Sequence, residues 1–231
     1  MNRFRDRTEA GRMLGERLRR RLAGHSNVLV LALPRGGVPV GFEVARALGA
    51  PLDLFLVRKL GVPGQEELAM GAIAEGGVRI LNHAVLDIVD VEDEEIERVA
   101  AREEAELRRR ATEYRGERAE PEVRGRTVVL VDDGLATGST MRAAAAAIRQ
   151  RGPAELIVAV PVAARETCDL LEREVDAVEC LRTPEPFHAV GIWYDRFDQT
   201  SDEEVRQLLA RAWSGEVGPP PESHASSGGQ R

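Results

Sequence analysis

Short, largely apolar runs alternate with segments of helical pattern along this chain. The runs cover residues 28–33, 52–57, 127–131 and 156–160 and consist mainly of Val, Leu, Ile and Ala. Strands that are buried on both faces are apolar at successive positions, and parallel strands need a crossover, usually a helix, between them. The pattern therefore predicts an α/β fold with a doubly wound, mainly parallel sheet. Ligands of such sheets bind beyond the carboxyl ends of the strands.

The length and the local composition predict one domain with two additions. We expect a single domain over residues 1–213, with a helical insertion and a small hood region. The charged segment at about 90–120 predicts an exposed helical arm, and residues 71–81 predict a hairpin around Gly76 and Gly77. Residues 214–231 are rich in Pro, Ser and Gly, which predicts a disordered tail.

Charge and composition argue against several classes of protein. The net charge is −7, whereas nucleic-acid binders usually carry a basic balance. No apolar run approaches the ~20 residues of a membrane-spanning helix, and residues 1–7 lack the apolar core of a signal peptide. We therefore expect a cytoplasmic protein with no nucleic-acid or membrane partner. The two cysteines and four scattered histidines fit no metal-ligand spacing, so we expect no metal bound directly by the protein.

The most informative segment reads VVLVDDGLATGST, from Val128 to Thr140. A buried strand brings two adjacent carboxylates, Asp132 and Asp133, to the edge of the sheet, and a loop of small residues leads directly into a helix. Backbone N–H groups at the start of a helix can bind a phosphate. The carboxylates would repel that phosphate, but they suit the hydroxyl groups of an attached sugar. The segment therefore predicts a site for a phosphorylated sugar with a cis diol.

Two familiar phosphate-binding loops and a plain turn account for the segment less well. A Walker A loop needs GxxxxGK[ST], but Gly134 and Gly138 are one residue too close together and no lysine follows. No GxGxxG opens any helix, so the dinucleotide-binding fingerprint is missing as well. An ordinary strand-to-helix turn, with the aspartates as turn formers and Ser139 as an N-cap, explains each residue singly but not the whole string.

The segment resembles the signature with which type I phosphoribosyltransferases bind 5-phosphoribosyl-1-diphosphate (PRPP), and the resemblance covers roughly residues 25–200. It implies transfer of the 5-phosphoribosyl group to a nitrogenous acceptor, such as a nucleobase, with release of diphosphate. Mg²⁺ would be bound mainly through PRPP. Asp132 and Asp133 would bind the ribose hydroxyls. The 5-phosphate would be bound by Ala136, Thr137, Gly138, Ser139 and Thr140.

The same resemblance implies a diphosphate loop and a flexible catalytic loop. Arg35, Gly36 and Gly37 follow the first core strand and would bind the diphosphate through charge and exposed N–H groups, although a plain glycine turn is an alternative. Residues 61–67 look like a mobile loop. Arg58 and Lys59 would reach the leaving diphosphate when that loop closes, unless they are only a basic end to a strand.

The acceptor is the least readable part of the sequence. Phe187 and Trp193 are candidates for an aromatic hood over a planar base, and His188 is a weaker one; the two rings could equally belong to the core. Family members that use hypoxanthine and guanine have an aspartate at the position of Ala136, which makes that choice doubtful here. Adenine- and orotate-type members have alanine.

Three further functions fit parts of the sequence. A non-catalytic, PRPP-sensing regulatory protein would keep the aspartates and the phosphate loop, but it would not need Arg58, Lys59 or a mobile lid. An enzyme of different chemistry could bind another phosphorylated sugar. A structural interaction protein could use the charged arm at 90–120 for partner contacts. The partners expected for the transferase are PRPP and a small-molecule acceptor, and the arm could serve a homodimer or cover the site.

Overall fold

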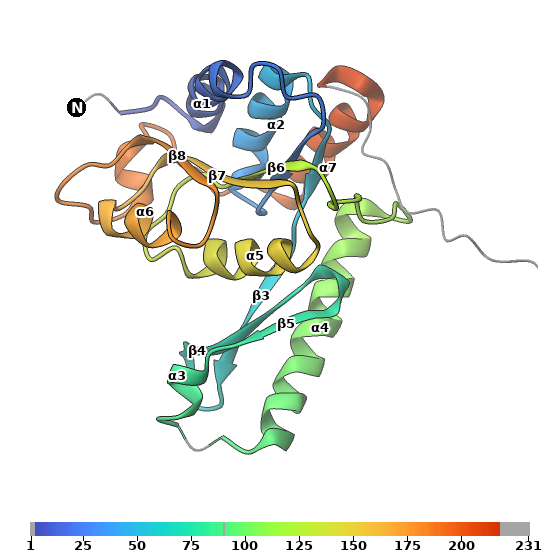
Figure 1. Ribbon diagram of the computed structural model, residues 1–231, viewed down its shortest axis with the longest axis vertical. Helices are drawn as coiled ribbons and strands as arrows, with labels where there is room; N and C mark the ends of the chain where they lie inside the picture. Colours follow the sequence, from blue (N-terminus) through green and yellow to red (C-terminus); the bar gives the residue numbers. More distant parts are fainter. Residues whose placement is uncertain (1–2, 90, 218–231) are drawn as a thin grey trace, which may run out of the picture.

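The main sheet of the computed structural model, which describes residues 3–89 and 91–217, has five parallel strands (Figure 1). In spatial order β2-β1-β6-β7-β8, they are Leu52–Leu54, Val28–Ala32, Thr127–Val131, Glu155–Val162 and Ala177–Arg182. All neighbouring pairs in this sheet are parallel. The prediction of a doubly wound, mainly parallel sheet is confirmed.

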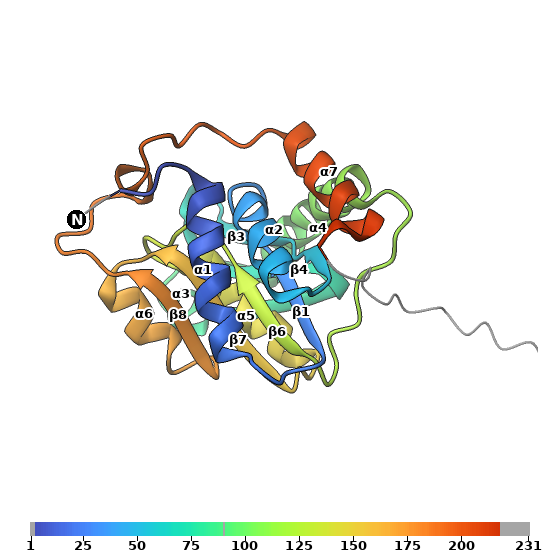
Figure 2. The same cartoon turned by 90° about the horizontal axis from the view of Figure 1, so that it is seen from above.

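Alternate side chains of each strand enter two separate cores. In β1, Val28 and Val30 pack into one core, and Leu29 and Leu31 pack into the other, as the pleat of a strand requires. The first core lies against α1 (Arg7–Arg21), α2 (Gly37–Leu48) and α7 (Asp202–Arg211). The second lies against α5 (Ser139–Gln150) and α6 (Arg165–Leu171). Figures 1 and 2 show these two groups of helices on opposite faces of the sheet.

A second, antiparallel sheet projects from the main one and forms an arm, defined here as residues 57–115 (Figure 1). It contains β3 (Val57–Val62), β4 (Gln65–Ala74), the short turn η1 (Glu75–Gly77) and β5 (Val78–Leu81), followed by α3 (His83–Leu86) and α4 (Asp93–Arg115). The hairpin predicted around Gly76 and Gly77 is confirmed.

Two predictions about the start of the arm are wrong. Residues 52–57 are not one strand, because the chain leaves the main sheet after Phe55, and Leu56 instead exchanges hydrogen bonds with Glu75. Residues 61–67 are not a loop, because Val62 pairs with Gln65 in a tight hairpin. Gly64 permits that turn with a φ of +79°.

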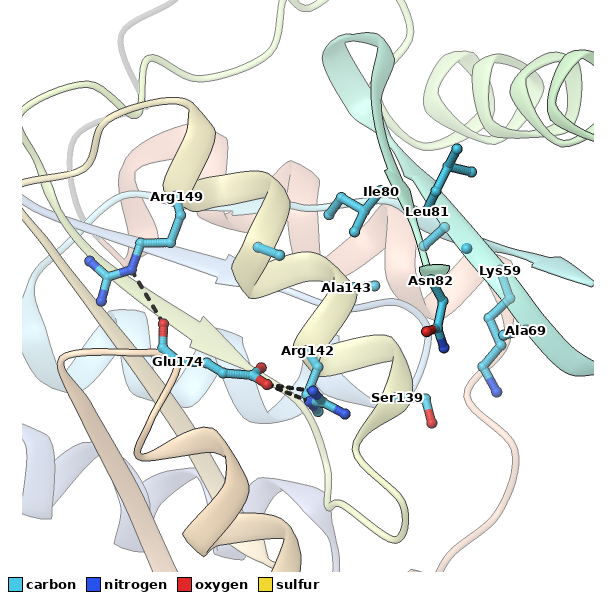
Figure 3. Close-up of a pocket in the computed structure, with 13 residues that line it drawn as sticks. Lys59, Ala69, Ile80, Leu81, Asn82, Ser139, Arg142, Ala143, Arg149 and Glu174 are labelled. Atoms are coloured by element: carbon cyan, nitrogen blue, oxygen red, sulfur yellow. Dashed lines mark hydrogen bonds and ion pairs between the residues drawn. The ribbon is translucent and has the colours of Figure 1, made fainter. Parts of the chain in front are cut away.

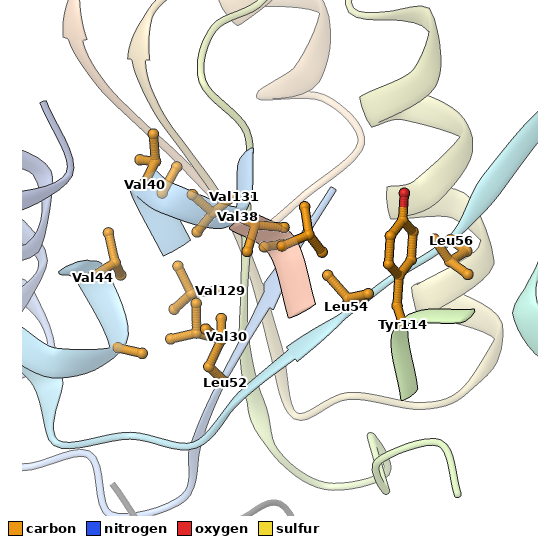
Figure 4. Close-up of a cluster of buried hydrophobic side chains, with 14 of the residues drawn as sticks. Val30, Val38, Val40, Val44, Leu52, Leu54, Leu56, Tyr114, Val129 and Val131 are labelled. Atoms are coloured by element: carbon orange, nitrogen blue, oxygen red, sulfur yellow. The ribbon is translucent and has the colours of Figure 1, made fainter. Parts of the chain in front are cut away.

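Helix α4 buries one face and exposes the other. Ile96, Val99, Leu107 and Tyr114 are buried, and Tyr114 lies beside strand residues of the main core (Figure 4). The outer face carries ion pairs between residues three or four positions apart, such as Arg109 with Glu106 and Glu113. The prediction of an exposed helix is therefore wrong for the inner face of α4. This face packs against β3 and α7, and a few apolar residues are enough to cover the contact.

Arg115, at the end of α4, joins the arm to the main sheet through a buried ion network. Its Nε lies 2.6 Å from Asp53 Oδ1, and its two terminal nitrogens contact the carboxylate of Glu75. Nη2 also donates to the carbonyl of Leu54 at 2.8 Å. Burial raises the pKa of both carboxyls, whereas Arg115 opposes that rise. Buried charges need such partners, so the network fixes the root of the arm.

The N-terminal segment pairs with residues near the C-terminal helix. Phe4 donates to the carbonyl of Trp193 and accepts from the N–H of Asp195, both at 2.8 Å, beside the short helix η2 (Val190–Trp193). Helix α7 begins after Ser201, whose side chain caps it by accepting from the N–H of Glu204. The predicted tail began at residue 214, but residues 214–216 belong to a π-helical turn, Ala212–Glu216; residues 218–231 lie outside the described residues. Among the residues described, no helix is both long and apolar enough to span a membrane.

Candidate active site

Asp132 and Asp133 lie at the middle of the sheet's carboxyl edge. They follow β6, the central strand, and both side chains are half-buried. The N–H of Leu33 donates to the carbonyl of Val131 at 2.9 Å, so the ends of β1 and β6 lie side by side. The loops that follow these two strands must therefore form one site.

The loop after β6 leads through Gly138 directly into α5. Gly138 has a φ of +67°, which favours glycine, and a Cβ there would lie 2.5 Å from Cγ2 of Thr167. The Thr167 hydroxyl donates to the carbonyl of Ala136 at 2.5 Å, so α6 supports the loop. The hydroxyls of Thr137 and Ser139 lie 3.1 Å apart on an exposed surface. No side chain caps α5, which leaves its N-terminus available to a phosphate.

The predicted diphosphate loop lies directly against the two aspartates. A Cβ on Gly36 would lie 2.0 Å from Oδ2 of Asp133, and one on Gly37 would lie 3.1 Å from Oδ1 of Asp132. While the aspartates keep these positions, only glycine fits at residues 36 and 37. The peptide bond between Pro34 and Arg35 is cis. The structure thus brings together two glycines and two aspartates that the sequence placed in separate loops.

Arg35 points from this loop toward the start of α7. Its Nη1 lies 3.5 Å from Oδ2 of Asp202, and the other oxygen of Asp202 accepts from the Tyr114 hydroxyl at 2.5 Å. A third of the Arg35 side chain is exposed, so the guanidinium can still meet an anion. The contact links the diphosphate loop to the end of α4, a relationship that no local pattern indicates.

Asp132 and Asp133, called the acidic pair below, lie in surroundings that favour binding of a proton or a cation. Burial and repulsion by Asp133 raise the pKa of Asp132 well above its ordinary range, and burial also raises the pKa of Asp133. Arg7 opposes both shifts, because its Nε lies 2.8 Å from Oδ2 of Asp133. Sequence analysis missed Arg7, which lies among several N-terminal arginines with nothing to distinguish it.

Arg58 and Lys59 are neighbours in β3 but have different surroundings. Arg58 donates from Nε and Nη2 to one oxygen of Glu103, at 2.9 and 2.6 Å, and so ties β3 to α4. It also lines a small cavity of about 30 Å³ beside Pro34 and Thr140. The Lys59 side chain is exposed and forms no hydrogen bond or ion pair with any residue in the described part of the chain. Figure 3 shows it pointing toward the space beside Ser139.

Comparison with known proteins decides the family. Residues 7–191 match the family model "Phosphoribosyl transferase domain". The chain belongs to this family. It is 45% identical to TT1426 from Thermus thermophilus, whose crystal structure it matches with a TM-score of 0.80 over 94% of this chain and 100% of that one.

Two curated relatives come from strains of Mycobacterium tuberculosis, CDC 1551 and H37Rv, and each is named "Putative phosphoribosyl transferase". Both are 47% identical to this chain over 212 residues, which is 92% of this chain and 47% of each relative. The chain therefore spans about half the length of these relatives.

The phosphoribosyl transferase domain has a cavity between its arm and α5. The cavity measures about 690 Å³ and begins at the phosphate loop, where Lys59, Asn82 and Ser139 line it (Figure 3). Arg142, one turn along α5 from Ser139, also lines the cavity and forms an ion pair with Glu174. Contact between Lys59 and the leaving diphosphate on closure of a loop stays a prediction; in the structure the Lys59 side chain lies on the same side of the cavity as Ser139 (Figure 3).

The predicted hood residues belong partly to the core. Phe187 and Trp193 are half-buried and pack against the cluster around Phe4 and Tyr194, whereas His188 is exposed. The hydroxyl of Tyr194 donates to the carbonyl of Asp133 at 2.6 Å, which anchors this region on the acidic pair. Contact between a base and Phe187 or Trp193 stays a prediction.

Proposed function

We propose that this domain transfers the 5-phosphoribosyl group of PRPP to a nitrogen nucleophile and releases diphosphate. The observation that carries the proposal is the close packing of Gly36 and Gly37 on Asp133 and Asp132, at the carboxyl edge of the sheet. This packing supports one continuous site with glycine N–H groups on one side and sugar-binding carboxylates on the other.

The phosphate loop suits the 5-phosphate of PRPP. The uncapped N-terminus of α5 supplies a positive dipole end, and Thr137, Ser139 and Thr140 add hydroxyl donors. Gly138 allows the backbone to approach a ligand closely. Lys59 from the arm is the cation best placed to join them, which makes a role at the 5-phosphate a better fit than one at the diphosphate.

The acidic pair suits the ribose. An ionised carboxylate accepts hydrogen bonds from sugar hydroxyls, and hydrogen bonds to a charged group are the stronger kind. Asp132 and Asp133 lie between the two phosphate-binding loops, as the ribose lies between the two phosphate groups of PRPP. In this pose the bond from C1 to the diphosphate oxygen breaks as a bond from C1 to the acceptor nitrogen forms.

Mg²⁺ would enter as part of the substrate. In this proposal PRPP itself would supply most of the ligands of the ion. The adjacent carboxylates of Asp132 and Asp133 suit the ribose part of this complex of Mg²⁺ and PRPP. The ion would neutralise charge on the departing diphosphate. The chain's own contribution is to orient the sugar and to bind the leaving group through Gly36, Gly37 and Arg35.

Release of diphosphate tests the proposal. The protein would be incubated with Mg²⁺ and PRPP, with and without each of a panel of purine and pyrimidine bases, and diphosphate would be measured. We expect release only when a suitable acceptor is present, and loss of release in D133N. A matched control is D169N, an exposed aspartate on α6. Binding of PRPP without turnover across a broad panel would favour a PRPP-sensing regulator instead.

A further inference from the structure

Arg7 is held rigidly beside the acidic pair although it lies far away in sequence. Its Nε donates to Asp133 Oδ2 at 2.8 Å, and its Nη1 donates to the carbonyl of Asp198 at 2.7 Å. The guanidinium also lies over the ring of Phe197, 3.9 Å from the centroid. Only 12% of the side chain is exposed. A buried arginine with three separate partners has one fixed orientation.

The backbone around Arg7 is fixed as well. Asp6 caps α1 by accepting from the N–H of Glu9 at 2.9 Å, so Arg7 occupies the first position of the helix. Phe4 is fully buried and bridges to Tyr194, whose hydroxyl binds the carbonyl of Asp133. The N-terminal segment and residues 194–198 therefore hold Asp133 from two directions.

We propose that Arg7 is a positioning residue of the PRPP site, which orients Asp133 and balances the charge of the acidic pair so that both carboxylates can accept ribose hydroxyls. This inference rests on the proposed function. Arg7 binds only one oxygen of Asp133, which leaves the other for the sugar. The role is indirect, because Arg7 acts through Asp133.

The charges around the pair favour this role. Asp132 repels Asp133 from within the same loop, and Arg7 is the cation that contacts the pair directly in the described structure. Tyr194 faces the same loop, and burial raises its pKa, so that it stays a neutral donor. Arg182 on β8 lies over the Phe4 ring, 3.7 Å from its centroid. Without Arg7, two neighbouring, half-buried carboxylates would share a proton to a higher pH.

Calorimetric titration of Mg-PRPP into R7Q, R7K and wild-type protein tests the inference. A matched control is R5Q, because Arg5 is an exposed arginine in the same segment whose side chain pairs, among the described residues, with Asp6 and not with the acidic pair. We expect Kd to rise at least about tenfold in R7Q, as for loss of a hydrogen bond to a charged group. R7K should recover part of the affinity, and R5Q should resemble wild type. The affinity of R7Q should also recover as pH rises, as the pair ionises at higher pH.

A second measurement follows the carboxyls without a ligand. Carbon-13 NMR of aspartate side chains should show a higher pKa for Asp133 in R7Q than in wild type. Equal Kd values and pH profiles for folded R7Q and wild type, or an unchanged Asp133 titration, would overturn the inference while leaving the proposed function intact. Failure of wild-type protein to bind Mg-PRPP would overturn both, so the two failures are distinguishable.

Discussion

Gly36 lies so close to Asp133 that a Cβ atom added to it would sit 2.0 Å from Oδ2 of the aspartate. No non-bonded pair of heavy atoms tolerates that distance, so the glycine is dictated by packing and not by turn geometry. The same oxygen accepts the hydrogen bond from Arg7. The acidic pair is thus enclosed by a glycine loop on one side and a guanidinium on the other, and its position depends on both.

Replacing Gly36 with alanine should disrupt this enclosure. The new methyl group must displace the Asp133 carboxylate or the diphosphate loop, and a misplacement of about 1 Å can cost roughly 100-fold in rate. We expect kcat/KM for PRPP to fall by about that factor in G36A. Gly24→Ala is the control, because a Cβ there meets nothing within 4 Å. It should lower stability by about 1 kcal/mol through its positive φ and leave kcat/KM unchanged. Wild-type kinetics for G36A would contradict this packing.

Gly138 and Thr167 form a second pair that a double variant can test. G138A adds a methyl group 2.5 Å from Cγ2 of Thr167 and strains a φ of +67°, and we expect KM for PRPP to rise. T167S removes Cγ2 but retains the hydroxyl that binds Ala136. The double variant G138A/T167S should therefore recover part of the affinity lost in G138A, whereas T167S alone should resemble wild type. If T167S brings no recovery, Thr167 does not constrain the phosphate loop.

Removal of Arg115 should destabilise the protein in a pH-dependent way. R115M leaves Asp53 and Glu75 buried without their cation, which costs about 3–5 kcal/mol in the free energy of unfolding at neutral pH. Both carboxyls already have a raised folded-state pKa. Stability from a raised acid pKa is present below the unfolded pKa and is lost as pH rises through the folded pKa. Without Arg115 these pKa values rise further, so the difference from wild type should shrink at acidic pH.

Urea unfolding of R115M and wild type at about pH 5.5 and pH 8 measures this effect. R108M is the control, because Arg108 is an exposed residue of the same helix paired with Glu104. Its loss should cost less than about 1 kcal/mol at either pH. If R115M loses as much free energy of unfolding at about pH 5.5 as at about pH 8, or more, then the two buried carboxyls are not the cause of the destabilisation.

Variants of Lys59 and Arg58 should separate an effect on catalysis from an effect on stability. K59M removes an exposed cation without a partner in the described chain, so we expect kcat/KM to fall at least about tenfold with an unchanged Tm. R58M removes both hydrogen bonds to Oε2 of the largely buried Glu103, which then keeps only the exposed Arg102 as its partner among the described residues, and should cost about 1–3 kcal/mol of stability. The double variant R58M/E103Q should recover some of that loss. A lower Tm in K59M together with a normal Tm in R58M would contradict both roles, the functional one of Lys59 and the stabilising one of Arg58.

The elements that the sequence predicted well are those determined by local pattern. Residues 128–140 contain the buried strand, the acids, the glycine turn and the helix start in one continuous stretch, so a short window describes the centre of the site. A parallel strand that is buried on both faces is apolar at successive positions, which is also a local pattern. For this reason β1, β6 and β7 could be predicted from the sequence.

The elements that were missed depend on partners distant in sequence. The end of β2 is set by Glu75, which exchanges hydrogen bonds with Leu56, and by Arg115, which binds Asp53. The hairpin between β3 and β4 is polar and contains Pro63 and Gly64, a composition that also suits a loop. Arg7 gains its role only because the N-terminus folds across the carboxyl edge of the sheet.

The central claim is that residues 128–140 bind PRPP, and calorimetry on an isosteric double variant tests it most directly. Mg-PRPP would be titrated into wild-type protein and into D132N/D133N, which keeps the shape of both side chains but removes the charges that accept ribose hydroxyls. The fold of each protein would be verified by thermal unfolding. We expect saturable binding by wild type and at least about 100-fold weaker binding by the variant, as for two lost hydrogen bonds to charged groups. Equal binding by the two proteins, or none by folded wild type, would contradict the claim.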